Sequence, residues 1–281
     1  MRFEVLTKQK KSNFISHDQK LSFNYKIKSY LTFKLKAKNE YSLHSPFMFE
    51  LYNNVFKKAR KRTSEFDNVE EMRKKLLADE TEIEFVNLGA GGIKNSVSKR
   101  KISQLTKTTS KKHKHARFLA YLAHYLQSKN ILELGTSLGI STLYLAKKNI
   151  DASITTVEGS KEVYNTALNN FRLTGFTNIK TIHSDFDSIL PDLIKNQQFD
   201  FIYIDGNHSY DATKCYFEWF KKKAGNETVI VFDDIYWSAD MTRAWKEIYA
   251  DTAVTVSIDL FEFGIVFFRK ELSKQHFVLR Y

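Results

Sequence analysis

The sequence predicts an α/β protein with a doubly wound, mostly parallel sheet that ends in an antiparallel β-hairpin and carries a basic, helical N-terminal extension. From residue 113 onward, short apolar stretches alternate with stretches of helical periodicity, which is typical of parallel strands joined by helices. At the end of the chain, apolar runs at 254–258 and 263–268 are joined by a short link without a helix, and this predicts an antiparallel pair.

We place the main domain at residues 112–281, and the alternation of apolar and helical stretches predicts its strands and helices. A helix is expected first, at 112–127. The predicted strands are 130–134, 153–157, 179–183, 199–204 and 228–232. Each is followed by a predicted helix, at 139–148, 160–173, 186–195, 210–223 and 238–249 respectively. Strands and helices in this order favour a parallel sheet with helices on both faces.

The preceding residues, 1–111, form the predicted extension. Its first 24 residues are polar without sustained periodicity and predict a loose tail. Ser45 before Pro46 is typical of a helix start, and apolar residues at helical spacing extend that helix over 46–61. A short helix is also expected at 70–77.

The glycine-rich segment 87–92 has the composition of a phosphate-binding loop. However, the residues that follow it, 93–101, are polar and aperiodic, so they offer no helix N-terminus to an anion. We interpret this stretch as a flexible loop that could cover the site as a lid.

Composition excludes several classes of protein. The chain has 281 residues, 42% of them apolar, with only 10 Gly and 2 Pro, so it is neither collagen-like nor of low complexity. Its single cysteine, Cys215, excludes an internal disulfide and a multi-cysteine metal site. No apolar run approaches the ~20 residues of a membrane span, and lysines stand where a signal peptide would be apolar. We therefore expect a cytoplasmic protein.

The positive charge is concentrated near the N-terminus. Residues 1–62 hold 15 Lys and Arg against 4 Asp and Glu, and residues 94–117 hold 9 Lys and Arg and no acid. A basic segment of this kind can bind phosphates of a nucleic acid, an anionic lipid or a charged substrate. It can equally be a solvated surface, and no RNA- or DNA-binding motif accompanies it.

Three strand ends carry candidate cofactor-binding residues. The first reads Glu133-Leu-Gly-Thr-Ser-Leu-Gly139, in which glycines permit a tight turn close to a ligand and the acid favours a cationic amino group over pyrophosphate. The second ends in Glu158 and Gly159, where a carboxylate can accept hydrogen bonds from both hydroxyls of a ribose. The third leads to Ser184-Asp-Phe186, placed to meet an adenine.

In this order, these residues and the terminal hairpin resemble class I S-adenosylmethionine-dependent methyltransferases, whose domain is Rossmann-like, over about 112–281. The resemblance implies that Glu158 binds the ribose of S-adenosylmethionine and Asp185 the adenine, and it assigns the methionine side to Glu133, Gly135 and Gly139. Neighbouring residues are also expected to bind the cofactor, namely Thr136, Ser137, Gly159, Ser184 and Phe186. The alternative for Glu158 and Asp185 is that each acid only caps the helix after its strand.

Two further strand ends bring three acids to the same edge. Asp205 follows the fourth strand, and Asp233 and Asp234 follow the fifth. Carboxylates that lie together repel one another unless a cation or proton sits between them, and oxygen ligands suit Mg²⁺. The alternative is a structural role, in which these acids cap a helix or bind backbone amides.

The segments around these acids are similar to the catechol O-methyltransferase-like group and to macrolide-sugar O-methyltransferases. In those relatives the three acids hold magnesium, and a histidine three residues after the first acid is the base. The resemblance thus gives Asp205, Asp233 and Asp234 as metal ligands, Asp205 also as a cofactor-binding and catalytic residue, and His208 as the base. A solvent-exposed polar role is the alternative for His208.

The sequence therefore favours an O-methyltransferase that acts on a hydroxyl of a small molecule or a sugar, assisted by a divalent metal. An RNA methyltransferase that holds its substrate with the basic N-terminal third is a second reading, and a non-catalytic cofactor-binding module is a third. With prolines only at positions 46 and 191, the chain has no Asn/Asp-Pro-Pro-Tyr/Phe motif of amino-directed DNA methylation. Neither the acceptor nor the oligomeric state follows from the sequence.

Overall fold

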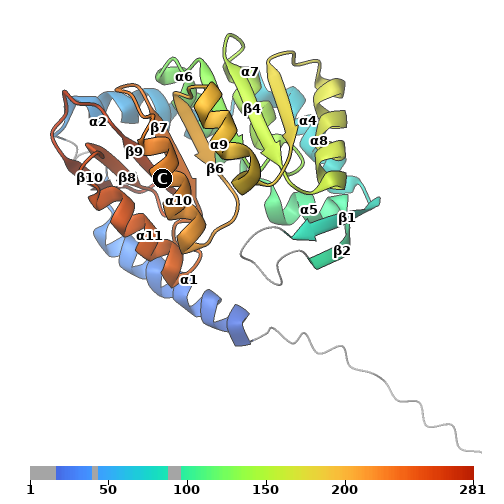
Figure 1. Cartoon of the computed structure of the whole chain (residues 1–281), viewed down its shortest axis with the longest axis horizontal. Helices are drawn as coiled ribbons and strands as arrows, with labels where there is room; N and C mark the ends of the chain where they lie inside the picture. Colours follow the sequence, from blue (N-terminus) through green and yellow to red (C-terminus); the bar gives the residue numbers. More distant parts are fainter. Residues whose placement is uncertain (1–16, 40–43, 88–95) are drawn as a thin grey trace, which may run out of the picture.

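The computed structural model describes residues 17–39, 44–87 and 96–281, and within them the strands of the main domain form one eight-stranded sheet. The sheet has the order β10-β8-β9-β7-β6-β3-β4-β5 (Figure 1). Its strands are β3 (Asn130–Leu134), β4 (Ser153–Glu158), β5 (Ile179–His183), β6 (Phe201–Ile204), β7 (Val229–Asp233), β8 (Val256–Asp259), β9 (Phe263–Phe267) and β10 (Gln275–Val278). The doubly wound sheet predicted from the sequence is confirmed.

The order of the strands in the sheet indicates where a ligand would bind. β3 pairs in parallel with β4 on one side and β6 on the other, so the order of connection reverses at β3. Leu134 lies opposite both Val157 and Ile204, and Ile204 lies opposite Phe232, so the carboxyl ends of four strands are level. In open α/β sheets, ligands bind outside the carboxyl ends of the strands at such a reversal.

The predicted terminal hairpin is also confirmed. β9 runs antiparallel to both β7 and β8. A further strand, β10, pairs in parallel with β8 at the edge of the sheet, and the sequence analysis did not anticipate it. Its four residues are only partly buried or exposed, which leaves little apolar periodicity to detect.

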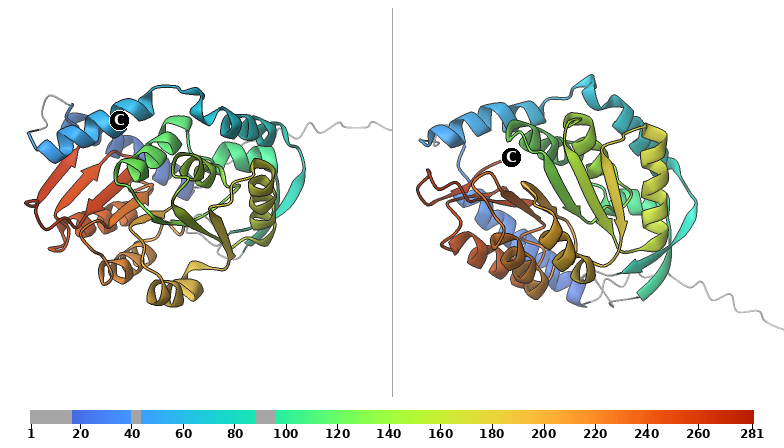
Figure 2. Two further views of the ribbon diagram at one scale, coloured as in Figure 1. Left: turned by 90° about the horizontal axis from the view of Figure 1, so that it is seen from above. Right: turned by 45° about the horizontal axis from the view of Figure 1, so that its top comes forward.

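The helices of the main domain start and end within a few residues of their predicted bounds. They are α6 (His113–Tyr125), α7 (Ile140–Lys148), α8 (Lys161–Thr174), α9 (Phe186–Asn196), α10 (Tyr210–Lys221) and α11 (Ala239–Ala250). Consecutive strand residues point to opposite faces, so Ile131 packs with Phe118 of α6 and Leu132 with Phe217 of α10. Helices therefore cover both faces of the sheet (Figure 2), which explains why the central strands β6 and β7 are almost wholly apolar.

The N-terminal extension is more ordered than its polar sequence suggests. Helix α1 (His17–Lys36) includes residues 17–24, so the predicted loose tail is wrong for that stretch. The helix expected over 46–61 is confirmed as α2 (Pro46–Leu51), a π-helical turn η2 (Tyr52–Phe56) and α3 (Lys57–Arg60). The Ser45 hydroxyl caps it by accepting from the Met48 amide at 3.5 Å. Phe56 stacks edge-on against Phe118, so this helix shares the main core.

In the described part, the rest of the extension contains one confirmed helix and three elements that the sequence analysis missed. The confirmed helix is α4 (Asp67–Ala78), which follows the short 3-10 turn η3 (Ser64–Phe66). The polar stretch expected to be a loop contains strand β2 (Ser96–Lys101), which pairs antiparallel with β1 (Glu82–Asn87), and is followed by helix α5 (Ile102–Thr109). Backbone pairing with β1 decides the structure of β2, in which half of the residues are exposed and the others are only partly buried. The possible lid residues 88–95 lie outside the described part.

In the described part of the chain, every helix is too short or too polar to cross a membrane.

Candidate active site

The turn after β3 is shaped by two glycines with left-handed backbone angles. Gly135 has φ +102°, and a Cβ there would overlap with the backbone carbonyl of Asp205 after β6. Gly139 has φ +86° at the start of α7, and a Cβ there would overlap with the Phe171 ring. Residues with a side chain rarely adopt such angles, so both positions require glycine. The turn is thereby packed directly against the loop that carries Asp205.

Glu133 lies beneath this turn and is fully buried. Its carboxylate accepts hydrogen bonds from Thr142 and, at 2.7 Å, from Thr156, whose hydroxyl is also 2.6 Å from that of Thr136. Burial raises the pKa of Glu133 to about 7. The acid therefore supports the turn from below.

Glu158 is the last residue of β4 and contacts the turn after β3. Its two carboxylate oxygens accept from the Ser137 amide at 2.8 Å and the Ser160 amide at 2.9 Å. Burial raises the pKa of Glu158. The neighbouring Gly159 carbonyl lies 3.2 Å from His183 Nε2. Each Glu158 oxygen has a second lone pair, which a ligand hydroxyl can use.

The third predicted segment follows β5. Asp185 is exposed and caps α9 by accepting from the Ser188 amide at 2.9 Å, while the Ser184 hydroxyl donates to the Asp185 carbonyl at 3.0 Å. The Phe186 ring packs against Gly206, where an added Cβ would come within 2.8 Å of it. The segment thus contacts the loop after β6, beside Asp205.

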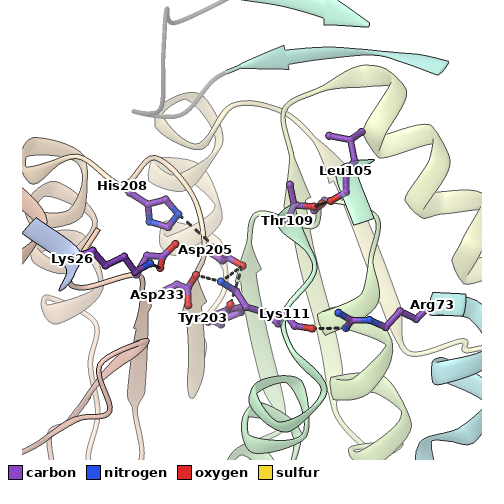
Figure 3. A network of polar contacts seen from close by, with 11 residues as sticks. Lys26, Arg73, Leu105, Thr109, Lys111, Tyr203, Asp205, His208 and Asp233 are labelled. Carbon is purple, nitrogen blue, oxygen red and sulfur yellow. Dashed lines mark hydrogen bonds and ion pairs between the residues drawn. The ribbon is translucent and has the colours of Figure 1, made fainter. Parts of the chain in front are cut away.

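The ends of β6 and β7 bring Asp205 and Asp233 together, with Lys111 between them (Figure 3). Lys111, which precedes α6, pairs closely with Asp233, and its Nζ is 3.4 Å from Asp205 Oδ2. The Tyr203 hydroxyl donates to the same Asp205 oxygen at 2.9 Å. Although burial opposes it, the Lys111 ammonium lowers the pKa of Asp205, whereas burial and the Asp205 carboxylate raise that of Asp233. Two acids thus share one cation.

The third predicted metal ligand, Asp234, is paired with a different lysine. Asp234 has φ +50° and forms an ion pair with Lys26 of α1, with Nζ 3.3 Å from Oδ1. Among the described residues, the group with metal-ligand spacing is Asp205, His208 and Asp233, whose ligand atoms lie within 4.8 Å of one another. This group contains two of the three acids that the sequence analysis named as metal ligands, and the predicted base His208 in place of Asp234.

His208 lies in the loop after β6, close to the acids. Its Nε2 is 3.7 Å from Asp205 Oδ1, and its ring is 6.4 Å from that of Trp237. Burial lowers the pKa of His208, so the imidazole is neutral at neutral pH and able to accept a proton. Lys26 Nζ lies 5.4 Å from the Trp237 ring, so helix α1 reaches this end of the site.

Several site residues were missed by the sequence analysis because they come from the extension. Lys111 and Lys26 are two of 44 basic residues, and nothing in their local sequence sets them apart. Thr109 at the end of α5 was missed for the same reason, although its hydroxyl is 2.6 Å from that of Ser137. Tyr203 could have been noted, because it lies two residues before Asp205 on the same face of a strand.

The part of the chain that is similar to known proteins includes the site residues predicted from the sequence. Residues 132–235 match a methyltransferase domain family. A catechol O-methyltransferase of Niastella koreensis is 34% identical over 125 residues, which are 42% of this chain and 55% of the relative. The chain thus spans about half the length of that curated relative.

Two solved structures have the same fold. An O-methyltransferase from Bacillus cereus in complex with SAH has a TM-score of 0.52 at 19% identity, over 77% of this chain and 96% of the other. An SAH-bound methyltransferase from Podospora anserina has a TM-score of 0.56 at 15% identity, over 82% and 100%. The chain thus contains a methyltransferase domain at residues 132–235, and its similarities and fold support a class I S-adenosylmethionine-dependent methyltransferase.

Proposed function

We propose that this protein transfers a methyl group from S-adenosylmethionine to a hydroxyl oxygen of a small molecule or a sugar. The observation that carries the proposal is the meeting of the Gly135 turn, Glu158, Asp205 and His208 at one edge of the sheet. Glu158 is bonded to the turn through the Ser137 amide, the Asp205 backbone packs against Gly135, and His208 lies 3.7 Å from Asp205, so these groups can meet one cofactor. The catechol O-methyltransferase similarity and the O-methyltransferase neighbour support oxygen as the acceptor atom.

The cofactor contacts are proposed as follows. Glu158, with Gly159, takes the ribose hydroxyls, and Asp185 and Phe186, with Ser184, take the adenine. The methionine end lies against the turn formed by Gly135, Thr136, Ser137 and Gly139, which Glu133 supports from its buried position. The exposure of Asp185 and the spare lone pairs of Glu158 support these roles, since both acids have acceptor capacity beyond their bonds to backbone amides.

The proposed reaction is an in-line displacement. The acceptor oxygen attacks the methyl carbon of the sulfonium, the carbon–sulfur bond breaks, and its electron pair stays on sulfur, which becomes the thioether of S-adenosylhomocysteine. The hydroxyl proton passes to His208 Nε2. Asp205, 3.7 Å away, stabilises the imidazolium that results.

A divalent cation such as Mg²⁺ is the second part of the proposal. When bound, such a cation would lower the pKa of the acceptor hydroxyl. Asp205 and Asp233 provide the oxygen donors that it prefers, and Asp233 Oδ1 is buried without a hydrogen-bond partner among the described residues. Asp234 would have to leave Lys26 to take part. The donors therefore fit the cation through Asp205 and Asp233, with His208 kept as the base.

Transfer of labelled methyl groups tests the function. The protein is incubated with S-adenosylmethionine labelled in its methyl group and a small-molecule extract, with and without RNA. We expect label in the small-molecule fraction, loss of transfer on chelation and recovery with Mg²⁺. Label in RNA would instead support the RNA methyltransferase reading. Transfer that is indifferent to the chelator would reject the metal while leaving the methyltransferase in place.

A further inference from the structure

Lys111 occupies an unusual position for a lysine. It lies in the short link between α5 and α6, and only 16% of its side chain is exposed. Its ammonium pairs with Asp233, whose side chain is 1% exposed, and lies 3.4 Å from Asp205 (Figure 3). A buried charge is stable only with such partners. The lysine thus provides one positive charge between the two acids that the proposed function gives to the metal.

Lys111 pairs with the Oδ2 atoms of Asp205 and Asp233, so a divalent cation on the same two carboxylates would lie close to its ammonium even if it used the other oxygens. Both are attracted to the same carboxylates, and two cations held between them would repel each other across a short distance in a poorly hydrated site. A cation that binds Asp205 and Asp233 must therefore break the Lys111 pairs. Breaking these pairs costs free energy, so it lowers the affinity of the wild-type protein for the metal.

The local structure allows the side chain to move while the backbone stays in place. Arg73 of α4 donates a hydrogen bond to the Lys111 carbonyl, and Thr109 contacts Ser137, so the link is held on both sides of the site. The lysine side chain itself has four flexible methylene groups and is partly open to solvent. It can leave the acids without unfolding the link.

We propose that Lys111 is an internal counter-cation of the acid pair, which a divalent metal must displace to bind. The proposal rests on the proposed function only for the location of the metal. It makes Lys111 a positioning residue that keeps Asp205 and Asp233 together without metal and sets the metal concentration at which the site fills.

Binding of Mn²⁺ alone, followed by electron paramagnetic resonance, tests this proposal. In Lys111→Met the competitor is gone, and a charge-assisted pair is strong enough that we expect Mn²⁺ to bind roughly tenfold to hundredfold more tightly than in wild type. Lys112→Met is the matched control, because it removes the same charge from the adjacent exposed position. Its affinity should change less than about twofold, since an exposed charge is screened. Lys111→Arg keeps a competing cation and should not gain affinity.

Equal gains in Mn²⁺ affinity in Lys111→Met and Lys112→Met would show a general charge effect and overturn the proposal. A gain in Lys111→Arg as large as that in Lys111→Met would also overturn it.

Amine labelling of the wild-type protein gives a second test, which needs no variant. Saturation with Mn²⁺ should speed acylation of Lys111, read by mass spectrometry, and leave Lys112 unchanged; an unchanged rate at Lys111 overturns the proposal. Calorimetric titration with S-adenosylmethionine tests the proposed function separately, because Lys111 is not among the residues proposed to contact the cofactor.

Discussion

The hydroxyls of Thr109 and Ser137 lie 2.6 Å apart and join the N-terminal extension to the turn after β3. Ser137 also donates its amide to Glu158, so this contact continues into the proposed ribose site. Two residues further along, Lys111 reaches the acids at the ends of β6 and β7. The segment before α6 is thus in contact with both halves of the site.

Thr109→Val tests this link. Valine keeps the shape of threonine but removes its hydroxyl, so Ser137 loses one hydrogen bond and the turn is less firmly held. We expect S-adenosylmethionine binding to weaken by about 0.5–1.5 kcal/mol in calorimetry. The control is Thr108→Val, because that hydroxyl bonds only to carbonyls of its own helix among the described residues. Equal affinities in the two variants would contradict the link.

Gly135→Ala tests the packing of the turn against the β6 loop. Alanine would be strained at φ +102° and would overlap with the Asp205 carbonyl. We expect a loss of about 1–3 kcal/mol or more in the free energy of unfolding, together with weaker cofactor binding. Gly175→Ala is the control: it has φ +71° but open space around the added Cβ, so it shows the backbone strain alone. If Gly135→Ala lowers the free energy of unfolding no more than the control does, Gly135 does not pack against the Asp205 carbonyl as described.

His208→Ala separates catalysis from binding. A general base typically contributes ~10²–10⁴-fold to the rate, so kcat should fall within that range while the affinity for S-adenosylmethionine stays near wild type. His113→Ala, in an exposed histidine of α6 that pairs with Glu70, controls for the loss of an imidazole. A variant with wild-type kcat would show that His208 is not the base, and joint loss of cofactor binding and stability would assign it a structural role.

His115 gives a pH dependence of stability. Burial lowers the pKa of His115 to about 3 in the folded protein, against ~6.5 when unfolded. Its contribution is therefore complete above pH 6.5 and is lost as the pH falls below it, because only the unfolded chain then takes up the proton. Between pH 6 and 4 this histidine should cost about 1.4 kcal/mol of stability per pH unit.

Urea unfolding of wild type and His115→Gln across this pH range measures the effect. The wild type should lose stability more steeply than the variant by about that slope. Parallel pH profiles would show that His115 is protonated in the folded protein and would contradict its assignment as a buried, neutral residue.

The difference between what the sequence predicted and what it missed has a physical basis. The central strands β3, β6 and β7 are buried on both faces, so their apolar runs are visible, and the turns at Gly135 and Asp205 follow directly from β3 and β6. β2 and β10 contain no fully buried residue and depend on backbone pairing with another strand, which leaves no apolar pattern. Lys111 meets Asp233 over a separation of 122 residues, and the local sequence contains no information about that contact.

The central claim is that the turn after β3 and Glu158 bind S-adenosylmethionine. Calorimetric titration of the cofactor into wild type and Glu158→Ala tests it most directly. We predict one site per chain in wild type and binding weaker by about 1–3 kcal/mol in the folded variant, because the ribose hydroxyls lose a charged acceptor. Absence of binding to wild type, or equal affinity in the two proteins, would contradict the claim.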